Sequence, residues 1–132
     1  MSEIKDEIRS GRIMSKEVVE AAAQKLADKR NEKMTKEMMR LAVDAEYNRK
    51  SALLNLQENR EKEDPIKACL KAKEANEQAV KDGKMTPEEF RTENEKAEDE
   101  QRKKIRDIES EFRMLRDQLY KQCYSVLNDW DD

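Results

Sequence analysis

Hydrophobic residues recur along this chain every three or four positions, which is the spacing of one face of an α-helix. The surrounding residues are mostly helix formers, chiefly Ala, Glu, Lys, Arg, Gln, Met and Leu. Short polar breaks with turn or capping residues separate the periodic segments. We therefore expect helices at about 2–10, 15–31, 35–62, 65–82 and 87–128, with turns near 11–14 and 83–86. The sequence predicts an all-α protein without a β-sheet.

Capping residues mark where these helices are expected to begin. Ser15, Thr35 and Thr86 each stand just before a periodic segment, and a side-chain oxygen there can accept a hydrogen bond from the first turn. Asp64 and Pro65 suggest another helix start, because a proline at the first helical position lacks an N–H that would be unpaired anyway. Between residues 31 and 34 the pattern weakens, and either a break or a bend fits it.

The stretch KDGKMTPEEF, residues 81–90, can be compared with a calcium-binding loop. With Gly83 at the sixth loop position, Asp82 and Glu89 fall on ligand positions, but Val80 occupies another and has no oxygen to offer. A corner between two helices explains the residues without an ion. Gly83 would end the first helix in the left-handed conformation, and Thr86 and Glu89 would form a capping box for the next.

The last helix is the longest, since nothing interrupts it from Pro87 to about residue 128. Such a helix would be about 60 Å long, so we expect an elongated unit of helical hairpins that spans residues 1–132. Alternating steps of three and four residues predict a coiled-coil seam in its second half. The seam consists of Ile105, Ile108, Phe112, Leu115, Leu119, Gln122 and Val126. We interpret this seam as a contact between chains.

Aromatic residues are scarce, at 5% of the chain, yet three of them gather in its last segment. Aromatic side chains are enriched where proteins dock, so Tyr120, Tyr124 and Trp130 are candidate contact residues. The alternative is that they pack on the protein's own hairpin. Flexible methionines also suit adaptable contacts, which adds Met34, Met38 and Met39 to the candidates.

Charged residues make up 45% of the chain, and acidic and basic residues nearly cancel to a net charge of −3. The interleaved signs disfavour general binding to nucleic acid or acidic membranes, which requires a net basic face. The basic cluster at 102–106 is flanked by Asp99, Glu100, Asp107 and Glu109, which screen it. No apolar run is long enough for a membrane span, and the first residues lack a signal-peptide core. We expect a protein of the cytoplasm or a virion interior that is not secreted.

Residues for catalysis or cofactor binding are few. The chain has no histidine, and Cys69 and Cys123 are two isolated thiols, so neither a zinc site nor any other metal or cofactor site is expected. Both cysteines are expected to be buried, reduced and apolar in character. No phosphate-binding glycine loop or nucleophile motif occurs. We therefore expect neither an enzyme nor a small-molecule substrate.

These observations favour a structural or assembly protein that associates with itself or docks onto a larger protein complex. Scaffolding, cargo and internal virion proteins of phages and viruses have this kind of composition. Two alternatives stay open: a helical protein that organises nucleic acid, and an adaptor or regulator that binds one soluble protein partner.

Overall fold

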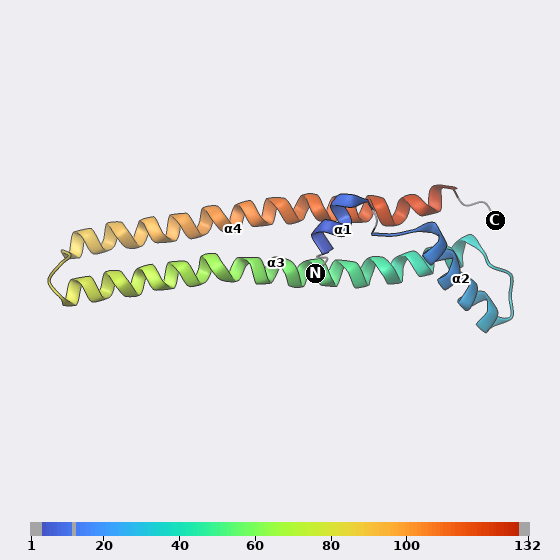
Figure 1. The fold of residues 1–132 in the computed structure, drawn as a ribbon, viewed down its shortest axis with the longest axis horizontal. Coiled ribbons are helices and arrows are strands. Elements are labelled where there is room, and N and C mark those ends of the chain that lie inside the picture. The colour runs from blue at the N-terminus through green and yellow to red at the C-terminus, as the bar shows by residue number, and fades with distance from the viewer. Residues whose placement is uncertain (1–3, 12, 130–132) are drawn as a thin grey trace. The chain divides into compact units, whose positions relative to one another are not determined.

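The structure, a computed structural model, describes residues 4–11 and 13–129. In this part of the chain all regular structure is helical and no strand occurs, which confirms the all-α prediction. The helices are α1 (Ile4–Ser10), α2 (Lys16–Arg30), α3 (Lys36–Lys81) and α4 (Pro87–Tyr124). A 3₁₀ helix, η1 (Ser125–Asp129), continues from α4 (Figure 1). The predicted long C-terminal helix is therefore also confirmed.

The chain divides into two compact units. Unit 1 contains the chain up to Leu56 together with the chain from Phe112 onward, and unit 2 is Gln57–Glu111. Both α3 and α4 contribute to both units. No local sequence signal marks a boundary at these positions, because each helix passes through them without a capping or turn residue.

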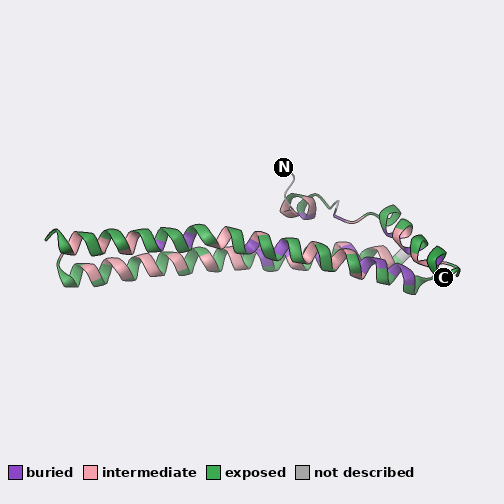
Figure 2. Cartoon of the chain, turned by 90° about the horizontal axis from the view of Figure 1, so that it is seen from below, coloured by how far each residue is buried: buried purple, intermediate pink, exposed green. Residues whose placement is uncertain are grey.

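Unit 1 holds most of the buried apolar side chains (Figure 2). Its core receives residues from all four helices and from the segment between α1 and α2. The core members are Ile8, Ile13, Val19, Ala23, Ala27, Met38, Met39, Ala42, Val43, Leu54, Phe112, Leu115, Leu119 and Cys123. Burial of this apolar surface is the main term that stabilises unit 1.

Capping residues set where α2 begins and ends and where α3 begins. The Val18 N–H donates to Ser15 Oγ at 3.2 Å, and the Met38 N–H donates to Thr35 Oγ1 at 3.3 Å. Both predicted N-caps are thus confirmed. Asn31 ends α2 with a left-handed φ of 56°, a conformation that asparagine tolerates better than most residues. The pattern around residues 31–34 therefore corresponds to a break and not to a bend.

Pro65 does not start a helix, and the prediction of two helices at 35–62 and 65–82 is wrong. Residues 36–81 form one helix with Pro65 inside it. A proline in a helix interior removes one backbone hydrogen bond and costs about 3 kcal/mol. The residues on both sides are strong helix formers, and the Pro65 ring is buried. This burial helps to offset the cost.

Unit 2 is a hairpin in which segments of α3 and α4 run antiparallel and side by side (Figure 1). Gly83 terminates α3 with a φ of 72°, and the Lys84 N–H donates back to the Ala79 carbonyl at 2.8 Å. The Glu89 N–H donates to Thr86 Oγ1 at 3.1 Å, and the Thr86 N–H donates to Glu89 Oε1 at 3.2 Å. This reciprocal pair is the predicted capping box.

Candidate functional site

The strongest part of the predicted seam lies inside unit 1. Phe112, Leu115 and Leu119 are buried by this chain's own residues, and so is Cys123 on the same helix. The seam was interpreted as a contact between chains, and for these three residues that interpretation is corrected. The physical reason is that other helices of unit 1 contact this part of α4, with Lys5 of α1 over Phe112 and Tyr47 of α3 against Tyr120, so the chain supplies the partner that the heptad pattern requires.

The other candidate contact residues differ in how far they are buried. Met38 and Met39 are buried in the core of unit 1, which removes them as surface contacts. Met34, Ile105, Ile108, Gln122 and Val126 are half-buried. Trp130 lies outside the described residues. The interface role of the half-buried residues stays a prediction.

The three tyrosines form one aromatic cluster in unit 1. The Tyr120 and Tyr124 rings lie 4.8 Å apart between centroids, and Tyr47 contacts them edge-on at 5.9 and 5.6 Å. The Tyr124 hydroxyl donates a hydrogen bond to Asp44. Burial, together with this hydrogen bond, raises the pKa of Tyr124 to about 12. The tyrosines therefore pack on the protein's own helices, as the alternative prediction stated.

Tyr120 keeps 54% of its surface exposed and remains the accessible edge of the cluster. Sequence reasoning missed Tyr47 as a member. A signal was available: Tyr47 is the only tyrosine besides Tyr120 and Tyr124 in a chain with few aromatic residues. The contact of Tyr47 with Tyr120 depends on how α3 pairs with α4, and the hydrophobic pattern of a single helix does not predict that pairing.

Helix α1 is attached to unit 1 through a few specific contacts. Ile8 is fully buried, and its carbonyl accepts a hydrogen bond from Gln122 Nε2 at 2.6 Å. Glu7 pairs with Lys50 at 3.4 Å, and Lys5 Nζ lies 5.4 Å from the centre of the Phe112 ring. Gln122 thus serves a structural purpose in the seam, although its Oε1 atom is buried without a hydrogen bond.

Polar pairs join the two helices of unit 2. Lys73 Nζ lies 2.7 Å from Glu98 Oε1, and this contact raises the pKa of Lys73 and lowers that of Glu98. Lys62 bridges Glu58 at 2.9 Å and Glu109 at 3.7 Å. Further along the hairpin, Asn76 Nδ2 donates to Asn94 Oδ1 at 2.9 Å. Exposed ion pairs such as Lys73–Glu98 stabilise weakly.

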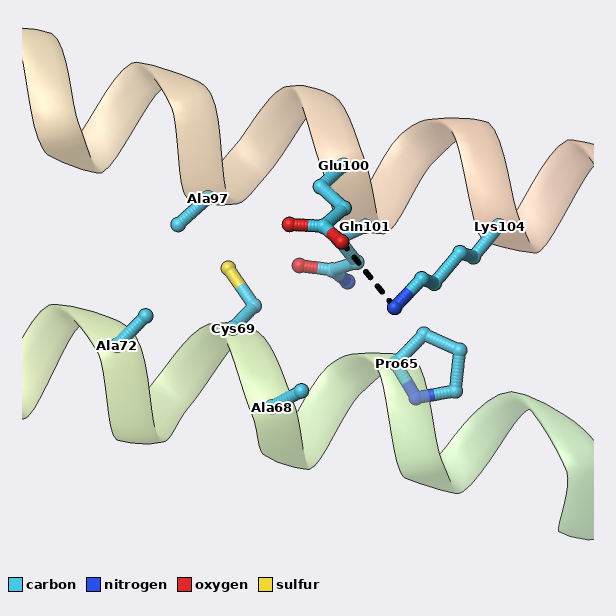
Figure 3. Close-up of a pocket in the computed structure, with 8 residues that line it drawn as sticks. All are labelled: Pro65, Ala68, Cys69, Ala72, Ala97, Glu100, Gln101 and Lys104. Atoms are coloured by element: carbon cyan, nitrogen blue, oxygen red, sulfur yellow. Dashed lines mark ion pairs between the residues drawn. The ribbon is translucent and has the colours of Figure 1, made fainter.

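A small cavity of about 70 Å³ separates the helices where small residues face each other (Figure 3). The Cys69 thiol points into it, and Glu100 and Lys104 form an ion pair at 3.2 Å on its rim. Alanines line much of the rest. Binding pockets for small molecules usually measure roughly 300–1,000 Å³. We interpret this cavity as incomplete packing and not as a substrate site.

Two large apolar side chains of α3 remain at the surface of unit 2. Ile66 is 42% exposed and Leu70 is 55% exposed. Pro65 and Cys69, their immediate neighbours in sequence, are buried toward α4. Successive residues of a helix are about 100° apart, so Ile66 and Leu70 lie on a different flank from the one that faces α4.

The basic cluster at 102–106 is partly neutralised by its neighbours on α4. Arg102 pairs with Asp99, and Lys104 pairs with Glu100 at 3.2 Å. These pairs reduce the positive field that a phosphate backbone would meet. The geometry adds no support to the nucleic-acid alternative.

The chemistry available to the described residues is limited. No group of three potential metal ligands comes together in residues 4–11 and 13–129. Both cysteines are buried and unbonded to each other, as predicted, and burial raises the pKa of the Cys123 thiol to about 11. A thiol with so high a pKa is a poor nucleophile at neutral pH. The expectation that the protein is not an enzyme stays a prediction.

Comparison with known proteins gives no relative: no family model, no curated protein and no solved structure matches this chain. Within the described part of the chain, none of the helices combines the length and apolar character that crossing a bilayer requires.

Proposed function

We propose that this chain is a non-enzymatic structural protein that assembles through its helical surfaces, either with itself or onto a larger protein complex. The observation that carries the proposal is the contrast between the two units. In Gln57–Glu111, all of which the structure describes, the buried residues are Glu58, Pro65 and Cys69. A hairpin with so small a core gains much from a protein partner that covers its exposed apolar side chains.

Unit 1 supplies the stable part of this arrangement. The fourteen core residues named above can keep unit 1 folded while unit 2 presents its surface. The finer proposal is that the protein acts as a scaffolding, cargo or internal virion component of a phage or virus. It rests on the highly charged, helical character of the chain.

The test is the molar mass of the full chain in solution, measured by light scattering behind a sizing column at micromolar and higher concentrations. We expect a defined oligomer, or a mass that rises with protein concentration, at both low and high salt. A monomer at every concentration that also captures no protein from its source would contradict the proposal. A one-to-one complex with a different protein would favour the adaptor alternative, and binding to nucleic acid that falls steeply with salt would favour a nucleic-acid organiser.

A further inference from the structure

Helix α1 is held on unit 1 by a small number of contacts. Of its seven residues, Ile8 is the buried one. A helix of this length is not stable by itself in water, so docking on unit 1 is what keeps α1 helical. Gln122 Nε2 donates to the Ile8 carbonyl, yet Gln122 Oε1 stays buried without a hydrogen bond, which lowers the net gain from docking. Such an element can open while the rest of the unit stays folded.

The surface that receives α1 is contributed by both long helices. We call it the α1-docking surface and define it by Lys50 of α3 and by Phe112 and Gln122 of α4. Lys50 Nζ lies 3.4 Å from Glu7 Oε2, and Lys5 Nζ lies 5.4 Å from the centre of the Phe112 ring. This surface therefore fits a short helix that carries an aliphatic, an acidic and a basic residue at these positions. Every other copy of the chain carries that helix, with the same residues at the same spacing.

The chain between α1 and α2 offers a hinge at Gly11. Ile13 is 6% exposed and anchors the chain to the core of unit 1, so any pivot of α1 lies between Ser10 and Ile13. Gly11 has a left-handed φ of 75°, and nothing from the rest of the described chain lies within 4 Å of the place where its side chain would begin. Packing therefore does not hold this conformation, and glycine adopts left-handed and extended conformations about equally. A change at Gly11 alone redirects α1 away from its own unit 1.

We propose that copies of this chain exchange α1, so that α1 of each copy docks on the α1-docking surface of the other, with Gly11 as the hinge. This inference rests on the proposed assembly function and names the partner, a second copy. Exchange keeps every contact that α1 makes, and the exchange of an identical element is a low-cost route to a dimer. The tethered α1 of the same copy competes at an effective concentration in the millimolar range, so we expect the wild-type dimer at about 1 mM protein.

The first test changes the hinge. Sedimentation equilibrium of the full chain, at concentrations up to about 1 mM, gives the dimer constant. Gly11→Val disfavours the left-handed conformation in both closed chains and should tighten the dimer roughly 30-fold. Gly11→Asn is the matched control, because asparagine tolerates this conformation better, and it should stay close to the wild-type chain. An unchanged dimer constant in Gly11→Val would overturn the proposal.

Adding Ile8→Asp to Gly11→Val separates exchange from any other association. The new charge prevents α1 from docking on either copy, so the double variant should return to a monomer. Near-ultraviolet circular dichroism of the three tyrosines in unit 1 checks that this unit stays folded. A folded double variant that dimerises as well as Gly11→Val would mean that another surface joins the copies, which contradicts exchange.

The second test alters charges and leaves the core unchanged. Glu7→Lys and Lys50→Glu chains each place like charges between α1 and the α1-docking surface, in the closed and the self-exchanged form alike. When the two chains exchange α1 with each other, one contact joins the two altered residues and the other joins the two native ones, and both contacts are attractive. The mixture should therefore dimerise about tenfold more tightly than the wild-type chain, whereas each variant alone should match the wild type.

A mixture of Glu7→Lys with Arg49→Glu is the matched control for this test. Arg49 is the neighbour of Lys50 on α3, but it pairs with Glu46 on its own helix. This mixture should show no gain over its separate components. If the mixture of Glu7→Lys with Lys50→Glu also associates no more than its components do, exchange of α1 is refuted.

The failures can be told apart. If the wild-type chain assembles but neither Gly11→Val nor the charge-altered mixture changes the dimer constant, exchange of α1 is wrong and the assembly function stands. If every chain and the mixture stay monomeric up to about 1 mM while the wild-type chain captures another protein, exchange is wrong and the adaptor alternative is favoured. If they stay monomeric and capture nothing, both proposals fail.

Discussion

Replacing Leu119 by alanine should destabilise unit 1 by about 3 kcal/mol. The Leu119 side chain is fully buried, and the change removes apolar groups worth about 0.8 kcal/mol per methylene and leaves a cavity with a further cost. Leu70→Ala is the matched control. It makes the same chemical change at a position that is 55% exposed, so it should cost less than about 1 kcal/mol in the monomer.

The assay is urea denaturation followed by near-ultraviolet circular dichroism. All three tyrosines of the chain lie in unit 1, so this signal reports the unit that contains Leu119. At a typical dependence on urea, a loss of about 3 kcal/mol lowers the midpoint by about 1–3 M.

Charged substitutions at the same seam separate its two interpretations. A contact between chains predicts that charged residues at Leu115 and Leu119 abolish assembly and leave most of the helix content. The structure predicts that the same changes unfold unit 1. A loss below about 1 kcal/mol for Leu119→Ala would refute the assignment of Leu119 to an internal core.

Three further outcomes follow from the structure. Tyr124→Phe should lower the free energy of unfolding by about 1 kcal/mol, measured by urea denaturation. The double variant with Asp44→Asn should lose less than the sum of the two single changes, because both remove the same hydrogen bond. Fully additive losses would contradict this contact. Gly83→Ala should cost about 1 kcal/mol in thermal unfolding because φ is 72° there, although the space around it is open; Gly83→Asn should cost less, and equal losses would indicate another cause. The pKa of Cys123 is raised to about 11 by burial from an ordinary value near 9, so the unfolded chain loses this proton first and the free energy of unfolding should fall as the pH rises from about 9 to about 11. That decline should be shallower in Cys123→Ala, and an unchanged pH profile would contradict the shifted pKa.

The sequence by itself determined the features that depend on neighbours along the chain. The helical period, the caps at Ser15, Thr35 and Thr86 and the glycine turn at Gly83 all involve contacts within a few residues. Such contacts are nearly the same in any helical protein, which is why the all-α fold and most helix ends could be predicted. Pro65 was the exception, because its local preference for a helix start was outweighed by strong helix formers on both sides and by burial of its ring.

Only the tertiary structure decided which helical faces meet. A heptad seam states that an apolar face needs a partner, but the pattern is the same whether the partner is another helix of the chain or another chain. Unit 1 places Phe112, Leu115 and Leu119 against the chain's own helices, and it brings Tyr47 beside Tyr120 from a distant part of the sequence. The same packing leaves Ile66 and Leu70 at the surface. Contacts between residues far apart in sequence depend on the register of α3 against α4, and the local pattern does not contain that register.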